Sequence, residues 1–279
     1  GLGMPAEPLF RSSYLSPSPP LTVGWMNLGL AKLKGCKVIY NVQEIYPDIL
    51  KLKGGFVQKF LSWMEHKVYN GSDAVTTIDK VFHDTIVDRF ENKSKLHIIP
   101  NFVDTDLYHE VPFKFSNTDD TNLTDKDATS KDSKLYTLDS KLFPNTDSIK
   151  LLYAGNIGHM QSWEPLVVLA DKTRDLNVEY FVIGEGAQRG YVEEEIKNRG
   201  LVKLHLLPYQ PRELMPAILS YSDASFIFMV PGRDGDGFPS KVYTIMACER
   251  PMLIMSGENT PIINFLKGKN CAKLITEQD

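Results

Sequence analysis

The segment DGFPSKVYTIMACERPML at residues 236–253 holds the side chains with the clearest chemical potential. Its opening loop consists of Asp236, Gly237, Phe238, Pro239, Ser240 and Lys241. The apolar residues that follow predict a helix, so Ser240 and Lys241 stand at a helix N-terminus. A cation is unfavourable at that end unless an anion lies nearby. We therefore interpret Lys241 as a partner for an anion such as a diphosphate, with a solvated surface lysine as the alternative.

Three further loops follow predicted strands and contain glycine or proline. Their candidate ligand contacts are Gly155, Asn156, Gly158 and His159 in the first loop, Gly184 and Gly186 in the second, and Tyr209 and Gln210 in the third. Ligands of open parallel sheets bind beyond the carboxyl ends of the strands. Glycine lets a ligand or another backbone come close, and the Tyr209 ring suits a planar base. Ordinary strand-to-helix turns remain the alternative. The second loop is not a dinucleotide fingerprint, because Arg189 stands where the third glycine of GxGxxG belongs.

The elements that must position these loops alternate between short β-branched or aromatic runs and longer helical stretches. We predict strands at 37–41, 74–78, 95–99, 149–154, 178–183, 202–206 and 224–229. Helices are predicted at 22–34, 56–69, 80–90, 162–173, 190–198 and 212–220. This alternation is typical of an α/β fold with parallel sheets. Residues 111–148 are polar and low in apolar groups, which predicts a flexible insertion or linker between domains at 1–110 and 149–279.

The composition narrows the class of protein. An apolar fraction of 42% and a charged fraction of 24% are ordinary for a globular protein, and the net charge of −4 does not fit a nucleic-acid binder. The longest apolar runs fall far short of the ~20 residues that cross a bilayer. Cys36, Cys248 and Cys271 share no disulfide or metal-ligand spacing, and the first residues do not resemble a secretion signal. We expect a cytoplasmic protein.

An amphipathic basic stretch at residues 50–69 leaves a membrane role open. Its apolar residues are Phe56, Phe60, Trp63 and Met64, and its lysines are Lys51, Lys53, Lys59 and Lys67. Such a helix can lie on an anionic membrane, which would place the protein at the inner membrane face. A core-facing helix with a solvated outer side explains the pattern equally simply.

The segment at 236–253 resembles EGFGLVALEAMACGTPVV of the family 4 glycosyltransferases, which have the two-domain GT-B fold. Its PSK form is similar to the bacterial subgroup that makes surface polysaccharides, such as the fucosaminyltransferases. Other matching stretches are LLYAGNIGHMQSWEPLV, FVIGEGAQRG, LHLLPYQPRELMPAILSYSDASF, VIYNVQEIYPDIL, GSDAVTTIDKVF and LHIIPNFVDTDLY. The resemblance implies two Rossmann-like domains, with the N-terminal one incomplete and the C-terminal one lacking its last helices.

The resemblance further implies retaining transfer of a sugar from a UDP-sugar to a lipid-linked or saccharide acceptor. The donor would lie on residues 149–279, where Lys241, Ser240 and the amides after Gly158 would stabilise the leaving diphosphate. We expect no cofactor and no metal, because no Asp-x-Asp metal motif stands after a predicted strand and Asp234-Gly235-Asp236 belongs to the loop already described.

Two departures from the family pattern concern the catalytic residues. Thr244 stands where relatives carry the second acid of a pair whose first member is Asp236, and Gln43 replaces a histidine of the acceptor domain. Gln43 cannot act as a base, so Glu44 and Asp48 become the candidates that orient an acceptor hydroxyl. A non-catalytic remnant that binds a nucleotide sugar, or acts as a scaffold, is therefore the main alternative. A nicotinamide-dependent oxidoreductase is a weaker one, because no strand is followed by GxGxxG and a later ribose-binding acid.

Overall fold

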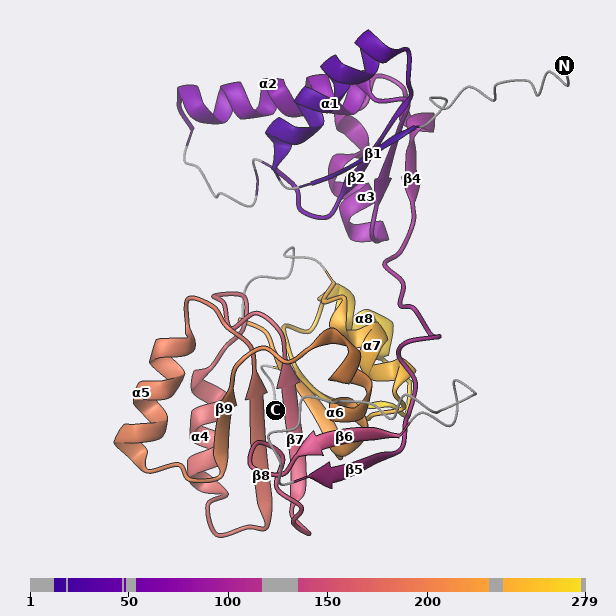
Figure 1. The fold of residues 1–279 in the computed structure, drawn as a ribbon. Helices are drawn as coiled ribbons and strands as arrows, with labels where there is room; N and C mark the ends of the chain where they lie inside the picture. The colour runs from indigo at the N-terminus through magenta and orange to yellow at the C-terminus, as the bar shows by residue number, and fades with distance from the viewer. Residues whose placement is uncertain are drawn as a thin grey trace, which may run out of the picture. The chain divides into compact units, whose positions relative to one another are not determined.

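The computed structural model describes residues 13–18, 20–46, 48, 54–116, 135–230 and 238–276. The chain divides into two units, Gly1–Asn101 with Gly235–Phe238 and Phe102–Asp234 with Pro239–Asp279. Each unit carries its own parallel sheet flanked by helices, so the predicted α/β class is confirmed (Figure 1). Within these ranges, no helix has the length and apolar character needed to cross a membrane.

The N-terminal unit contains a four-stranded parallel sheet. Its strands are β1 (Tyr14–Pro17), β2 (Val38–Val42), β3 (Ala74–Thr77) and β4 (Leu96–Ile98), in the order β1-β2-β3-β4. Its helices are α1 (Leu21–Lys34), α2 (Phe56–Gly71) and α3 (Lys80–Ile86), followed by two short 3₁₀ turns at Val87–Arg89 and Lys93–Lys95. Because neighbouring strands follow one another along the chain, right-handed crossovers place all three helices on one face of the sheet. Tyr40 and Val42 of β2 pack there against Met64 and Val68 of α2.

The C-terminal unit contains a six-stranded sheet in the order β12-β11-β10-β7-β8-β9, with every pair parallel. Its strands are β7 (Ile149–Ala154), β8 (Val178–Ile183), β9 (Leu204–Leu207), β10 (Ala224–Phe228), β11 (Met252–Met255) and β12 (Ala272–Ile275). The chain reverses its direction of winding between β7 and β10. A ligand crevice is expected at such a reversal, beyond the carboxyl ends of these two strands.

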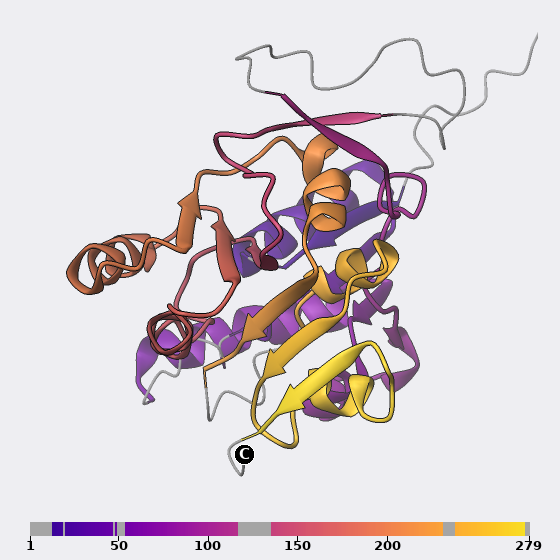
Figure 2. The same ribbon diagram turned by 90° about the horizontal axis from the view of Figure 1, so that it is seen from below.

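Helices cover both faces of this sheet, as Figures 1 and 2 show from two directions. They are α4 (Glu164–Lys172), α5 (Arg189–Arg199), α6 (Met215–Tyr221), α7 (Lys241–Ala247) and α8 (Pro261–Leu266), with a 3₁₀ turn at Arg212–Leu214 before α6. Tyr180 and Val182 of β8 join Leu166 of α4 in one core cluster. Phe181, between them, contacts the ring of Tyr221 in α6 at 5.5 Å, on the opposite face.

The range predicted as a linker, 111–148, contains two strands that the sequence analysis did not find. They are β5 (Phe113–Ser116) and β6 (Tyr136–Asp139), which pair with each other in parallel. Phe113 and Phe143 pack edge-on against Tyr221, at 6.1 and 5.5 Å between ring centroids. The strands are too short for their alternation to stand out beside the polar residues 117–134, which lie outside the described residues. The ends of this range therefore belong to the C-terminal unit.

Candidate functional site

Lys241, the first residue of α7, is a cation that has no counter-ion among the described residues. Its Nζ lies 3.6 Å from the centroid of the Tyr153 ring, within cation–π distance. No carboxylate of the described residues forms an ion pair with it. The residue as a whole is partly exposed, yet burial of the ammonium lowers its pKa to about 7. An unpaired cation of this kind is available to an anionic ligand.

Gly155 makes room for that lysine at the carboxyl end of β7. A Cβ atom on Gly155 would lie 2.7 Å from the Nζ of Lys241. Its φ of 145° is also a conformation that side chains rarely adopt. The predicted role of this glycine as a site of close approach is thus visible, although the group that approaches it is the side chain of Lys241.

A cavity of about 280 Å³ opens at the reversal point between β7 and β10, and Lys241 lines it. Other members of its wall are Gly155, Tyr209, Gln210, Arg212 and Thr244, over an apolar floor that includes Leu152 and Phe226. Ser225 also lines the cavity, and within the described part of the chain its buried hydroxyl has no hydrogen-bond partner. A wider hollow of about 460 Å³ shares Lys241, Gly155 and Thr244 and adds Asn156 and Ser240. The structure therefore brings together seven of the fifteen predicted donor-binding residues around these two hollows.

Gly184 and Gly186 have a different role from the predicted ligand contact. A Cβ on Gly184 would lie 1.9 Å from the carbonyl oxygen of Gly155, and one on Gly186 would lie 2.5 Å from that of Ile157. The two loops are also joined by a hydrogen bond from the Ile157 amide to the Glu185 carbonyl, at 2.8 Å. These glycines allow the loops after β7 and β8 to pack backbone against backbone, and neither lines the two hollows around Lys241.

Arg189 and His159 lie beside this loop contact. The guanidinium of Arg189 donates to the carbonyl oxygens of Gly184 and Leu207, at 2.7 and 3.1 Å, which ties the loops after β8 and β9 together. His159 lies 2.7 Å from the side-chain nitrogen of Gln188 and lines a separate hollow beside α4. Gly158 accepts a hydrogen bond from the Trp163 indole at 3.1 Å. His159 and Gly158 therefore do not line the two hollows around Lys241.

The structure describes only part of the segment that begins with Asp236. Asp236 and Gly237 lie outside the described residues, and Phe238 is grouped with the N-terminal unit. Pro239 precedes the helix without lining either hollow. Thr244 lines both, and its hydroxyl donates to the Lys241 carbonyl at 2.8 Å, so its oxygen can still accept a hydrogen bond from a ligand.

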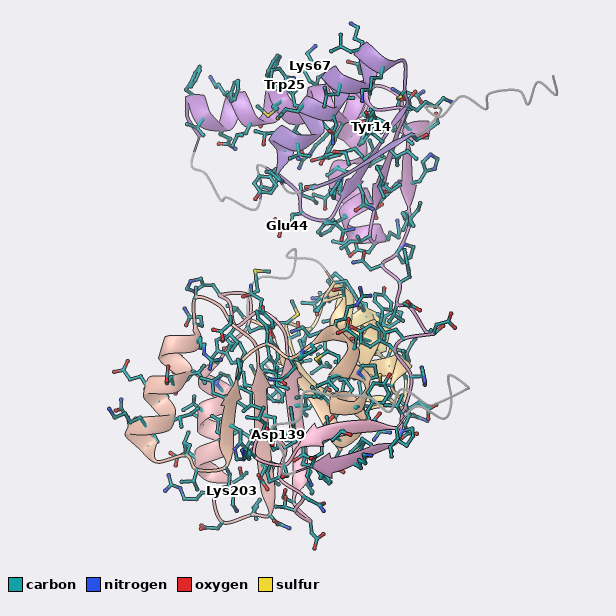
Figure 3. All side chains as sticks on the ribbon, in the orientation of Figure 1. Tyr14, Trp25, Glu44, Lys67, Asp139 and Lys203 are labelled. Carbon is teal, nitrogen blue, oxygen red and sulfur yellow. The ribbon has the colours of Figure 1, made fainter. Side chains whose placement is uncertain are left out.

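The three candidate acceptor residues lie after β2 in the N-terminal unit. Glu44 is half-buried, burial raises the pKa of its carboxyl, and Figure 3 labels its position. Gln43 donates from its side-chain amide to the side chain of Asn41. Asp48 accepts a 2.5 Å hydrogen bond from Arg89, which also binds the buried carboxylate of Glu65 at 2.7 Å. Of the two carboxylates, that of Glu44 forms no ion pair with any described residue.

Three residues near Lys241 were missed by sequence reasoning. Arg212 and Tyr108 line both hollows, and Asp104 lines the wider one. Arg212 follows the proline at the end of the loop after β9. Because that loop was already a candidate for ligand contact, Arg212 could have been predicted from its position in the sequence. Asp104 and Tyr108 belong to residues 1–110, the range that the sequence pattern predicted as the first domain. Their place in the C-terminal unit could be found only from the packing.

Two family models match consecutive parts of the chain. Residues 19–107 match Glycosyltransferase Family 4, and residues 137–264 match Glycosyl transferases group 1. Among curated proteins, the chain is 24% identical over 225 residues to an Escherichia coli (strain K12) protein with the provisional name of colanic acid biosynthesis glycosyl transferase WcaI. That alignment covers 78% of this chain and 51% of WcaI. The chain thus spans about half the length of this curated relative.

Solved structures share the fold. HepE of Anabaena, solved with UDP and with UDP-glucose, is 13% identical with a TM-score of 0.65, and the match covers 94% of this chain and 64% of HepE. Sucrose-phosphate synthase of Thermosynechococcus elongatus is 14% identical with a TM-score of 0.67, over 96% of this chain and 61% of the synthase. At these identities the likeness concerns the fold. The two consecutive family matches and the match to WcaI show that this chain belongs to the family 4 glycosyltransferases, and the solved structures show the GT-B fold.

Proposed function

We propose that the protein transfers a sugar, with retention of its anomeric configuration, from a UDP-type nucleotide sugar to a lipid-linked or saccharide acceptor. We assign this transfer to cell-surface polysaccharide synthesis, as the name of WcaI suggests for that relative. The donor site is the crevice around Lys241, and the acceptor lies on the N-terminal unit near Glu44. HepE, which was solved with UDP-glucose, supports a UDP-sugar as the substrate.

The ammonium of Lys241, which forms no ion pair within the described part of the chain, is the observation that carries this proposal. Cleavage of the bond between the sugar and the diphosphate leaves additional negative charge on the diphosphate, which preorganised donors must stabilise. Lys241 stands where ligands of such sheets bind, and Arg212 adds a second cation to the same cavity wall. The Ser240 and Thr244 hydroxyls supply hydrogen-bonding groups at the same place.

The proposed acceptor site has fewer candidate residues than the proposed donor site. Glu44 can accept a hydrogen bond from an acceptor hydroxyl, and burial favours its protonated form. Asp48 is held by Arg89, so we assign it to positioning the loop after β2 rather than to contact with the acceptor. A lipid-linked acceptor would require contact with the inner face of a membrane, and the exposed aromatic residues of α2 are consistent with such a contact.

A titration with UDP and a panel of UDP-sugars, followed by a turnover assay on the same samples, tests the proposal. We expect UDP to bind and at least one UDP-sugar to be hydrolysed or transferred. Failure of every nucleotide to bind would contradict the donor site. Binding of NADH in place of UDP would support the oxidoreductase alternative.

Metal-independent transfer is a separate part of the proposal. No cluster of three or more histidine, cysteine, aspartate or glutamate side chains suited to a metal is present in the described ranges, and residues 234 and 236 lie outside them. We expect activity to persist in EDTA. Complete loss in EDTA with recovery in manganese would overturn this part and leave the donor site itself unaffected.

A second candidate function is nucleotide-sugar binding without turnover. Thr244 supports it, because an uncharged residue stands at the position of the second acid of the family pattern. The pairing of Asp48 with Arg89 supports it as well, because it removes one candidate from the acceptor side. Tight UDP-sugar binding without hydrolysis or transfer, with any acceptor offered, would favour this function.

A further inference from the structure

The hollow beside α4 is a further cavity at the carboxyl ends of the strands in the C-terminal unit. It measures about 290 Å³ and shares no lining residue with either hollow around Lys241. Its wall comes from segments that follow three parallel strands, with Trp163 after β7, Tyr191 after β8 and Val230 after β10. Ligands of such sheets bind at the carboxyl ends of the strands, and this volume lies at the lower end of the range for small-molecule sites.

The side of this hollow that follows β7 is held in a fixed position. Gln161 forms an isolated antiparallel bridge with Met229, which joins the loop after β7 to the end of β10. The Trp163 side chain is buried, and its ring packs edge-on against Tyr153 with centroids 4.9 Å apart. The hollow is therefore preformed, as small-molecule sites usually are.

One polar atom of a lining residue is left unsatisfied. The side-chain oxygen of Gln161 is buried and has no hydrogen-bond partner within the described ranges. A buried acceptor without a partner costs free energy, which a ligand that donates a hydrogen bond would recover. Glu164 adds carboxylate oxygens to the wall, where it accepts from the Tyr191 hydroxyl and lies 3.6 Å from Arg199. This set of acceptors favours a ligand with several hydroxyl groups.

The hollow is also aromatic and lacks the cations of the donor site. Tyr191, Trp163 and His159 line it, and its described lining residues include no lysine or arginine. Lys241 and Arg212, by contrast, line both of the other hollows. A phosphate group therefore has cationic partners in the donor site and none in the wall of the hollow beside α4.

We propose that the hollow beside α4 binds one neutral pyranose ring of a saccharide, independently of the nucleotide. The apolar face of a pyranose stacks on aromatic rings such as Tyr191, and its hydroxyl groups donate to acceptors such as Gln161 and Glu164. The inference rests on the proposed function for the origin of that sugar, which is a unit of the saccharide acceptor other than the one that reacts. The hollow thus retains the acceptor on the protein without contributing to donor binding.

Saturation-transfer difference NMR with the methyl glycosides of glucose, galactose, N-acetylglucosamine and fucose tests the proposal, with saturating UDP present to fill the donor site. At least one glycoside is expected to bind the wild type, while glycerol gives no signal. Gln161→Leu should weaken that binding about 5-fold, the effect of one lost hydrogen bond. Tyr191→Leu removes the ring and should also weaken it about 5-fold, whereas Tyr191→Phe keeps the ring and should stay within about 2-fold of the wild type.

The matched control is Gln58→Leu, which changes a half-buried glutamine of the N-terminal unit and should leave glycoside binding unchanged. Melting temperatures show whether each variant is folded, and Tyr191→Leu provides the test if Gln161→Leu does not fold. No glycoside binding by the wild type, or equal binding by the wild type, Gln161→Leu and Tyr191→Leu, would overturn the proposal.

A second outcome concerns the position of the bound sugar. A glycoside signal that appears only without UDP would place the sugar in the donor site and overturn the proposal as well. UDP titration of the same samples should give equal affinities for the wild type and all variants. Failure of UDP to bind would contradict the donor site, and it leaves the glycoside result as an independent test of the hollow beside α4.

Discussion

The loop after β2 and the loops after β7 and β8 are held in place by different kinds of interaction. In the N-terminal unit, Arg89 forms ion pairs with Asp48 of the loop and with the buried Glu65 of α2. These charges therefore neutralise one another within the unit. In the C-terminal unit, glycines let the loops hydrogen-bond backbone to backbone, and Lys241 keeps its charge free of any described acid. A buried charge therefore marks a ligand site only when the protein has not neutralised it.

The largest expected effect comes from breaking the ion pairs of the N-terminal unit. Arg89→Met leaves the buried Glu65 without its partner, which should lower the free energy of unfolding of this unit by about 3 kcal/mol at pH 7.5. Hydrogen-exchange mass spectrometry measures the free energy of unfolding of each unit separately. Lys80→Met, which removes an exposed pair with Asp84, is the control and should cost less than about 1 kcal/mol. Equal losses for both variants would show that Arg89 does not hold this unit together.

The corresponding change in the C-terminal unit is Gly184→Ala. The new Cβ would meet the Gly155 carbonyl, which should destabilise this unit by about 2 kcal/mol and weaken UDP binding as the loops move apart. Gly190→Ala in α5 is the control, since nothing lies within 4 Å of its Cβ position, and it should stabilise the helix by about 0.5–1 kcal/mol. Thermal melting of both variants measures the difference. A neutral effect of Gly184→Ala would refute the backbone packing of these loops.

The pH dependence should have opposite signs in the two units. The pKa of Glu65 is raised to about 7, mainly by burial, so the native state keeps a proton that the unfolded chain has lost, and stability falls as pH rises from about 5 to 7. The pKa of Lys241 is lowered to about 7, so above pH 7 the unfolded chain holds the extra proton and stability rises toward pH 9. Each slope approaches about 1 kcal/mol per pH unit.

Urea unfolding of the wild type, compared with Glu65→Gln and Lys241→Met, isolates each contribution to that pH dependence. Saturating UDP should suppress the rise above pH 7, because the ligand favours the charged lysine. The same slope in wild type and Lys241→Met would contradict the lowered pKa of this side chain.

The smallest expected effect concerns Glu249, an exposed charged residue that neither holds one of these loops in place nor lines the hollows around Lys241. Glu249 adopts a φ of 56° after α7, a conformation that favours glycine, and the family motif has glycine there. Glu249→Gly should therefore stabilise the C-terminal unit by about 0.5 kcal/mol, the relief of backbone strain being partly offset by the flexibility of glycine in the unfolded chain. Thermal melting measures the gain, and UDP affinity should not change. A lower melting temperature would show that the side chain of Glu249 stabilises the fold.

The sequence pattern predicted the main sheets well because long alternations of strand and helix carry a strong periodic signal. The strands β2, β3, β7, β8 and β10 were found within one or two residues. β1, with two serines and prolines around it, and the short pair β5 and β6 gave no such signal. Their pairing depends on partners far away in the chain.

The candidate site was predicted in part. Gly155, Lys241 and Thr244 could be located because motifs place them at strand ends and helix starts. The contact of Gly184 with the Gly155 carbonyl and the pairing of Asp48 with Arg89 could not, because both depend on the distance between segments that are remote in sequence.

Titration of UDP into wild type, Lys241→Met and Lys197→Met, followed by isothermal calorimetry, tests the central claim most directly. Lys197 is an exposed lysine in the last turn of α5 and serves as the matched control. We expect equal affinity for wild type and Lys197→Met and at least 10-fold weaker binding for Lys241→Met, the loss expected for a hydrogen bond to a charged group. Folded Lys241→Met protein that binds UDP as tightly as wild type would contradict this expectation.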